Sequence, residues 1–378
     1  MRKKSKIIHV LHAVGGVDVY LRLLLQHIDD EWFEFVVVHG ENDTTKEYVN
    51  KYNQKIKSYR LPIQREISFG KDLTSIFKLR QIIKKEKPDL IHVHSAKGGI
   101  VGRGANLFFK SKVLYTPHAF SYLSAESNRK KFIYKTIERI FRFSGNYVLA
   151  TSPSEANRAI KEVHYKKNRV IVYNNSVEPI TEIGQQTEFK LPGKYICSIG
   201  RPSYQKNIET MVEVFAKVKK EVPDISLVLM GVGYHSPNEE QVKQLIKKHD
   251  LEDSFVMLPW VARESIFPII RDSILYISTS RYEGLPYSLI ESMALSKACV
   301  VSDCDGNRDL IKDGVNGRVY SQEQLHDSMH KGIIELIKDD KKRQEFEQNS
   351  YQLFNKNYNI DLTISNLKRI YNELIKNS

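Results

Sequence analysis

Short runs of β-branched and aromatic residues alternate with helical stretches along the whole chain, and this alternation constrains the fold more than any other feature. A strand, a helix and a second strand in succession form a parallel βαβ unit, whose working loops lie at the carboxyl ends of the strands. Candidate strands occur in both halves, at residues 7–11, 35–38, 90–93, 113–115, 147–150, 170–173, 195–199, 226–230, 254–258, 274–278 and 298–302. The pattern predicts an α/β protein with two Rossmann-like domains.

The length of the chain and a polar connection near its middle place these domains. With 378 residues, the chain exceeds one ordinary core and suits two domains of roughly 150 to 200 residues. Residues 174–194 hold two prolines and two glycines among mostly polar residues, which indicates an interdomain connection. We therefore expect domains at residues 1–178 and 190–355. Apolar residues between 360 and 375 recur on one helix face, so an amphipathic closing helix is expected at about residues 356–378.

Composition bounds the compartment and the partners. No uninterrupted run of about 18 apolar residues occurs, and a basic start leads directly into a candidate strand, as expected of a cytoplasmic protein. The three cysteines form neither a disulfide framework nor a CxxC pair, which is typical of a reducing compartment. Residues 1–178 carry 32 Lys and Arg against 17 Asp and Glu, a net charge of +15, whereas the remaining residues carry −2. The first half is therefore expected to meet nucleic acid, an anionic membrane surface or phosphorylated substrates.

Two glycine loops each follow a strand and precede a helix, an arrangement in which backbone N–H groups can hold an anion. Gly15-Gly16 is the first, and a plain tight turn explains it equally well. In the second, Gly200-Arg201 ends a strand and Lys206 lies where the next helix begins. A glycine, a guanidinium and an ammonium together suit a diphosphate, although a solvated basic loop would have the same composition.

Residues 281–291 place two carboxylates eight positions apart across a strand-to-helix turn. Glu283 lies on the loop and is expected to face a cleft, while Glu291, two turns into the helix, could reach the hydroxyl pair of a ribose. The amide-rich turn Gly284–Ser288 suits a phosphate or a sugar at the helix N-terminus. Together with the basic loop upstream, these carboxylates form the strongest pattern in the sequence.

This arrangement resembles the retaining glycosyltransferases of family 4 (glycosyl transferases group 1), which have the GT-B fold and a signature of two glutamates separated by seven residues. The resemblance runs over nearly the whole chain. Among members of the family, the chain resembles bacterial capsule, exopolysaccharide and lipopolysaccharide assembly enzymes. It implies two Rossmann-like domains that face each other across a cleft, with the closing helix packed back on the first domain. The matching segments are Gly15-Gly16, His92 to Ser95 with Lys97 to Gly99, Thr116 to His118, Gly200-Arg201 with Lys206, Gly231 to Gly233, Glu283 to Glu291, and Asp309 to Gly317.

The resemblance implies transfer of a sugar from a nucleotide-diphosphate carrier, most commonly UDP in this family, to a glycan or polyprenyl-linked acceptor. Arg201 and Lys206 would hold the diphosphate and stabilise the leaving group, and Glu283 would meet the transferring sugar. His118 would donate a hydrogen bond at the reacting centre; its alternative is a histidine that merely ends a strand. Further donor contacts are expected at Gly15, Gly16, Gly200, Gly233, Trp260, Val261, Gly284, Leu285, Ser288, Leu289 and Glu291.

The acceptor is expected on the first-domain side of the cleft. His94, Ser95, Lys97 and Arg103 follow the strand at 90–93, and we place all four on one loop. For Lys97 and Arg103, simple solvation of a turn is the alternative.

Three departures from the family pattern affect the predicted site. Asp18 and Asp309 stand where glutamate is usual, and Pro286 replaces a glycine and so removes one amide donor. Asp303-Cys304-Asp305 has the form of a metal clamp, but the basic loop already neutralises a diphosphate. We therefore predict a loop or strand cap there, with no metal and no cofactor other than the donor nucleotide sugar.

Residues 128–145 predict a helix with apolar residues on one face and Lys and Arg beside them. One hypothesis is that this helix contacts an anionic bilayer that presents a polyprenyl-phosphate acceptor, which would bring the enzyme to the inner face of the cytoplasmic membrane. An ordinary surface helix that turns its apolar face to the core has the same pattern.

Two other classes of function compete with sugar transfer. A nucleotide-sugar epimerase of related two-domain fold would also bind a UDP-sugar, and only dependence on an acceptor separates the two activities. A basic nucleic-acid-binding protein would explain the charge of the first half. However, the sequence has no RNP-type strand, zinc-finger spacing or recognition helix, and its second half is slightly acidic. We therefore expect no nucleic-acid partner.

Overall fold

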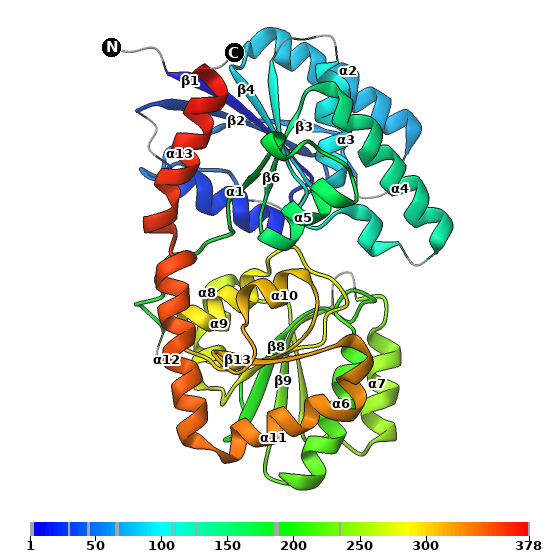
Figure 1. Cartoon of the computed structure of the whole chain (residues 1–378), viewed down its shortest axis with the longest axis vertical. Coiled ribbons are helices and arrows are strands. Elements are labelled where there is room, and N and C mark those ends of the chain that lie inside the picture. Colours follow the sequence, from blue (N-terminus) through cyan, green and yellow to red (C-terminus); the bar gives the residue numbers. More distant parts are fainter. Residues whose placement is uncertain are drawn as a thin grey trace. The chain divides into compact units, whose positions relative to one another are not determined.

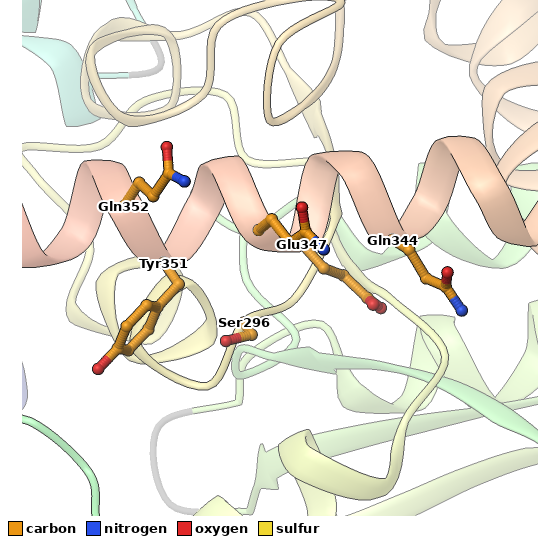
Figure 2. A pocket seen from close by; sticks show the side chains of 6 residues that line it. Ser296, Gln344, Glu347, Tyr351 and Gln352 are labelled. Atoms are coloured by element: carbon orange, nitrogen blue, oxygen red, sulfur yellow. The ribbon is translucent and has the colours of Figure 1, made fainter.

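The chain divides into two compact units in the computed structural model (Figure 1). The first unit comprises residues 1–175 and 360–378, and the second comprises residues 176–359. The first unit thus ends three residues before the predicted 178, and the closing helix begins at 360 rather than 356. The structure describes residues 4–28, 31–43, 46–64, 68–107, 109, 111–125, 127–184, 189–233 and 236–376.

The first unit is built on a parallel sheet with strand order β3-β2-β1-β4-β5-β6-β7. Its strands are β1 (Ser5–Val10), β2 (Phe33–Gly40), β3 (Lys57–Leu61), β4 (Leu90–His94), β5 (Lys112–Thr116), β6 (Tyr147–Ala150) and β7 (Val170–Val172). Its helices are α1 (Gly16–His27), α2 (Phe69–Glu86), α3 (Ser95–Asn106), α4 (Asn128–Phe141), α5 (Pro153–Lys161) and α13 (Ile360–Lys376).

Helices cover both faces of this sheet. The chain runs from β1 to β2 in one direction and from β3 through β7 in the other, and right-handed crossovers put α1 on one face and α2 to α5 on the opposite face. Helix α13 lies beside α1 (Figure 1). It brings Tyr371 onto β4, where the tyrosine hydroxyl lies 2.8 Å from His92 Nδ1. The last helix therefore completes the first core, as predicted.

Alternation along β1 separates two environments in this core. Ile8 and Val10 join the large apolar cluster under α2 to α5. His9, which is fully buried, points to the other face, where its ring lies 5.1 Å from that of His92. The side of the sheet under α1 and α13 is therefore lined with buried histidines as well as aromatic residues.

The second unit repeats the design with strand order β10-β9-β8-β11-β12-β13, again parallel. The strands are β8 (Tyr195–Ile199), β9 (Ser226–Val232), β10 (Phe255–Pro259), β11 (Tyr276–Ser278), β12 (Cys299–Ser302) and β13 (Gly317–Tyr320). The helices are α6 (Ile208–Glu221), α7 (Glu239–Lys248), α8 (Arg263–Asp272), α9 (Tyr287–Ala294), α10 (Asp305–Leu310), α11 (His330–Lys338) and α12 (Asp340–Asn357).

Each sheet has one point at which the strand order reverses, and open parallel sheets bind ligands outside the carboxyl ends of the strands at such points. In the first unit the reversal lies between β1 and β4, and in the second between β8 and β11. The prediction of two Rossmann-like α/β domains is therefore confirmed, and the two reversals define where the candidate site residues must be sought.

Candidate active site

In the second unit, the basic loop and the acidic loop meet where β8 and β11 lie side by side. Lys206 Nζ lies 2.7 Å from Glu283 Oε1, and Gln205 Nε2 lies 3.2 Å from Glu283 Oε2. Arg201 is half-buried on the same loop. A Cβ at Gly200 would lie 3.1 Å from Lys206 Cγ, so the glycine makes room for the lysine side chain. A cation and a carboxylate thus meet at the carboxyl end of this sheet, and a second cationic residue stands on the same loop.

Hydrogen bonds and close backbone contacts fix the acidic turn. Tyr276 on β11 donates to Ser288 Oγ at 3.0 Å and accepts from the backbone N–H of Ile199 at 3.3 Å, so one side chain connects β8, β11 and α9. Gly306 packs against this turn, because a Cβ there would lie 2.4 Å from the carbonyl oxygen of Gly284. The turn that carries Glu283 is therefore held from two sides.

Glu291 is 3% exposed and has a partner that the sequence did not suggest. Its carboxylate accepts a hydrogen bond from Arg263 at the start of α8, and Arg263 also lies 3.2 Å from Glu178 Oε2. Burial raises the pKa of Glu291, and the nearby Arg263 charge opposes that rise. A ribose at Glu291, which stays a prediction, would approach a carboxylate that is already oriented by a guanidinium.

The other residues of the second unit that were predicted to contact the donor differ in their exposure to solvent. Leu285 and Leu289 are buried at 3% and 1% exposure, so a contact with a ligand would have to come from their backbone. Gly233 is exposed after β9 with φ of +115°, a conformation that favours glycine. Trp260 is 64% exposed at the end of β10, and Val261 beside it is half-buried.

The aspartates of the Asp-x-Asp segment lie beside an arginine. Arg308 Nε lies 2.5 Å from Asp303 Oδ1, and Arg308 Nη1 lies 3.8 Å from Asp305 Oδ1. Asp305 is also the first residue of α10. Both carboxylates are thus associated with one guanidinium at a helix start, where negative charge is favourable.

In the first unit, Gly15 and Gly16 follow β1 and open helix α1. Gly15 is the N-cap residue with φ of +58°, and Gly16 is exposed. Asp18, which stands where the family has glutamate, accepts hydrogen bonds from Arg22 Nε at 2.9 Å and from the hydroxyl of Tyr48 at 2.8 Å. Asp18 therefore anchors the first turn of α1, a role that does not need the longer side chain.

His118 follows β5 and lies at one end of a row of histidines. Its Nε2 is 3.3 Å from His94 Nδ1, and His94 Nε2 is 3.0 Å from His9 Nδ1. Burial lowers the pKa of His118 to about 3. The next residue after His94, Ser95, opens helix α3 with φ of +59°. Neighbouring side chains thus orient the His118 ring, and its role at a reacting centre stays a prediction.

The histidines His9, His92 and His94 are the one group of three residues in the described part of the chain that could hold a metal ion. Both ring nitrogens of His92 already have hydrogen-bond partners, Tyr371 at Nδ1 and Thr116 at Nε2, each at 2.8 Å. A cation here would have to break one of these bonds without a carboxylate to offset its charge. The geometry therefore favours a hydrogen-bonded histidine cluster.

The prediction that His94, Ser95, Lys97 and Arg103 share one exposed acceptor loop is wrong, because His94 ends strand β4 and the other three belong to helix α3, and because His94, Lys97 and Arg103 are buried. Lys97 Nζ lies 2.8 Å from Asp72 Oδ1. Arg103 Nη2 lies 3.0 Å from Glu138 Oε2, and neither side chain is more than 3% exposed. The alternative of a solvated turn is wrong for the same reason. These cations join α3 to its neighbours α2 and α4.

Comparison with known proteins shows the class to which this site belongs. A family model described as Glycosyl transferases group 1 matches residues 179–353. A second, described as Glycosyltransferase Family 4, matches residues 14–179, so that the two models adjoin and cover most of the chain. The chain belongs to the family 4, group 1 glycosyltransferases. The prediction of this family is thereby confirmed, and the comparisons give no support to the epimerase alternative.

Curated relatives of this glycosyltransferase match it along its full length. A galactosyltransferase of Escherichia coli, named UDP-Gal:alpha-D-GlcNAc-diphosphoundecaprenol alpha-1,3-galactosyltransferase, is 25% identical over 99% of the chain and 98% of the relative. The capsular polysaccharide biosynthesis glycosyltransferase CapM of Staphylococcus aureus is 21% identical over 100% of the chain and 99% of the relative.

Solved structures share the fold of the glycosyltransferase. Sucrose-phosphate synthase from Thermosynechococcus elongatus superimposes with a TM-score of 0.86 at 16% identity, covering all of both chains. HepE from Anabaena, solved in complex with UDP and glucose, superimposes with a TM-score of 0.79 at 16% identity, covering 98% of this chain and all of HepE. Within the described residues, none of the helices combines the length and apolar character needed to cross a membrane.

Proposed function

We propose that this glycosyltransferase moves a sugar from a UDP-sugar to a glycan or polyprenyl-diphosphate-linked acceptor, with retention of configuration and without a metal ion. The names of the Escherichia coli relative and of the HepE complex, which include UDP-galactose, a diphosphoundecaprenol acceptor and UDP, support this choice. The observation that carries the proposal is the pair of Lys206 and Glu283 at the strand-order reversal of the second sheet.

The chemistry follows from the charges at this point. As the bond between sugar and phosphate breaks, negative charge grows on the departing diphosphate and positive charge grows on the sugar ring. Fixed cations stabilise the first charge most when they are positioned before the reaction. Lys206 is held by Glu283, and Arg201 lies on the same loop, so the loop after β8 carries two cationic side chains. Leaving-group departure driven by these side chains needs no divalent ion.

Replacement of Lys206 by methionine tests the central assignment. We expect kcat to fall by about 10² to 10³-fold, equivalent to about 2.7 to 4 kcal/mol, because a positioned charge at the leaving group is lost. Lys220→Met is the matched control, since Lys220 is exposed at the far end of α6. A thermal-shift screen of nucleotide sugars identifies the donor first. Turnover of the Lys206 variant equal to that of the control would reject the assignment.

Two further assays address retention and metal use. The anomeric configuration of the product, read by proton NMR, should equal that of the donor, and inversion would contradict the proposal. Turnover should survive EDTA. Loss of activity in EDTA with recovery in Mn²⁺ would instead assign the phosphate contact to a metal, with Asp303 and Asp305 as its first candidate ligands.

Helix α4 supplies the surface through which the enzyme would reach a lipid-linked acceptor. Phe132, Ile140 and Phe143 on α4 and the turn after it are 69%, 62% and 77% exposed, so this part of the helix does not turn to the core. Arg129, Lys130 and Lys131 in its first turn are exposed as well. Exposed apolar side chains beside cations are typical of contact with an anionic bilayer. This contact would bring the enzyme to the inner face of the cytoplasmic membrane.

A second stripe supports the same surface. Phe69, Leu73 and Phe77 recur every fourth residue on α2 and are 90%, 56% and 55% exposed. Helices α2 and α4 cover the same face of the first sheet, joined by α3 (Figure 1). Isolated exposed apolar residues are common, whereas a row of three on α2, in the same helical layer as the exposed part of α4, is suited to contact with lipid.

Vesicle binding tests this surface. The triple change of Arg129, Lys130 and Lys131 to Glu should reduce co-sedimentation with vesicles that contain anionic lipid. Lys135 is unsuitable for the test because it is paired with Glu162 at 2.7 Å. The matched control changes three exposed lysines of the second unit, Lys220, Lys247 and Lys248, to Glu. Equal binding of the two variants would exclude α4 as the membrane contact.

A further inference from the structure

Three buried or half-buried histidine rings form an unbranched hydrogen-bonded row that ends at the predicted reacting centre. His9 on β1 lies 3.0 Å from His94 on β4, measured between Nδ1 and Nε2. His94 Nδ1 in turn lies 3.3 Å from Nε2 of His118 after β5. The rings of His9 and His94, and those of His94 and His118, are stacked at interplanar angles of 17° and 25°. The row therefore crosses the strand-order reversal of the first sheet.

Proton counting couples the three rings. Burial lowers the pKa of His9 and of His118 to about 3 and holds that of His94 well below its usual value, so each ring carries a single N–H at neutral pH. Each contact in the row needs one donor and one acceptor. Only two arrangements satisfy both contacts: every ring protonated at Nδ1, or every ring protonated at Nε2. The tautomer of His118 therefore depends on that of His9, two rings away.

The far end of the row selects between these arrangements. His9 Nε2 is buried and has no hydrogen-bond partner among the described residues. In the Nε2–H arrangement this atom would be a buried donor without an acceptor, whereas in the Nδ1–H arrangement it is an acceptor without a donor. Among backbone groups, an orphaned buried N–H is rarer than an under-satisfied carbonyl, and we apply the same ranking to the ring nitrogens. The Nδ1–H arrangement is thus favoured for the whole row.

The backbone conformation and the neighbouring ring of Tyr20 fix the orientation of the His118 ring. His118 and Ala119 have φ of +53° and +75°, which non-glycine residues adopt only when the surroundings impose it. Ala119 N–H donates to Glu155 Oε1 at 2.7 Å, which holds this strained turn. The ring of Tyr20 packs edge-on against His118 at 4.9 Å between centroids. The ring cannot therefore exchange its two nitrogens by a simple flip without breaking these contacts.

We infer that His9 and His94 are positioning residues that hold His118 in the Nδ1–H tautomer, so that the ring edge turned away from the row presents a hydrogen-bond donor. If His118 faces the transferring sugar, as the proposed function requires, this donor would meet a sugar hydroxyl or ring oxygen. Neither His9 nor His94 would touch the substrate. His9 and His94, which the transfer chemistry does not otherwise use, would thus act on the substrate only through His118.

NMR of the full chain labelled with ¹⁵N-histidine tests the inference without substrate or turnover. The ¹⁵N shifts of protonated and unprotonated ring nitrogens differ strongly, and single histidine replacements assign the signals. We expect protonated Nδ1 and unprotonated Nε2 for His9, His94 and His118 at pH 7. In His94→Phe, the Nδ1 signal of His118 should move toward the unprotonated position. Nε2 of His118 then no longer has to accept a hydrogen bond from His94 and can itself carry the proton.

A matched control and a second variant separate orientation from simple loss of packing. His92→Gln removes a ring that contacts His94 at 4.1 Å but lies outside the row, and its amide can still serve Tyr371 and Thr116. The tautomer of His118 should stay unchanged in this control. If His94→Phe does not fold, His9→Phe provides the same test. Two results would overturn the inference: an Nε2–H tautomer at His118 in the parent protein, or an Nδ1–H tautomer that persists after the row is broken. Neither result would affect the outcome for Lys206.

Discussion

Replacement of Arg103 tests how much a buried ion pair contributes to the stability of the first unit. Its side chain is fully buried, and its partner Glu138 is 3% exposed at 3.0 Å. The guanidinium also lies 4.1 Å from the centre of the Tyr115 ring, and Tyr115 donates to the other oxygen of Glu138 at 2.8 Å. Arg103→Met preserves most of the volume but leaves the carboxylate of Glu138 buried with only a neutral donor.

Breaking a buried ion pair from one side costs about 3 to 5 kcal/mol, because the remaining charge loses its compensation. In a unit of this size, each kcal/mol corresponds to about 2 to 4 °C in Tm. Arg103→Met should therefore lower the Tm of the first unit by about 6 to 20 °C in calorimetry. The double variant with Glu138→Gln should recover most of this loss, since the buried charge is then absent while Tyr115 keeps an acceptor.

Acceptor kinetics complete the test. Below its Tm, the Arg103 variant should keep the parent KM for the acceptor, because the side chain is enclosed between α3 and α4. An unchanged Tm together with a raised acceptor KM would refute this reasoning and restore Arg103 to the binding surface.

Two other predictions concern stability and the acidic turn. Burial disfavours the Glu86 carboxylate, but hydrogen bonds from two lysines and a tyrosine lower its pKa to about 2, below the value of about 4.5 in the unfolded chain. Its contribution of about 2 to 3 kcal/mol should be complete above pH 5 and disappear as the pH falls toward 2. Urea unfolding of Glu86→Gln should thus differ from the parent at pH 7 but not at pH 2, and a gap of equal size at both pH values would contradict this. Gly306→Ala should lower both turnover and stability, the latter by about 1 to 3 kcal/mol, because its Cβ would lie 2.4 Å from the Gly284 carbonyl oxygen. Gly193→Ala, where a Cβ would meet nothing within 4 Å, is the control, and equal behaviour of the two variants would show that the turn adapts.

The sequence predicted most of the fold because buried parallel strands read as apolar, β-branched runs. It missed β3 and β13, and both are edge strands. In β3 only Leu61 is buried, and the strand otherwise reads Lys-Ser-Tyr-Arg. An edge strand has one pairing neighbour and needs little apolar surface. Such a strand therefore need not contain the run of apolar residues from which strands were predicted.

The candidate site divides along similar lines. Spacing placed Gly200, Lys206 and Glu283 after the strands of the second sheet, since the carboxyl ends of parallel strands share one edge of a sheet, but it failed for Lys97 and Arg103, which lie buried in α3. The ion pairs could not be predicted, because they join residues far apart in the sequence, such as Arg103 with Glu138 or Arg263 with Glu291. The partners Glu138 and Arg263 are ordinary members of amphipathic helices, and no local signal separates them from solvated charges.

The place of helix α13 has a consequence for how the protein is made. The second unit occupies an uninterrupted stretch, residues 176–359, whereas the first unit needs a segment synthesised after that stretch. During synthesis, the seven strands of the first sheet emerge before α13. Strand β4 therefore lacks its contact with Tyr371 until that helix has followed. The later unit can thus reach its native state before the earlier one, and the histidine-lined face of the first sheet stays incompletely covered until residues 360–376 have been synthesised.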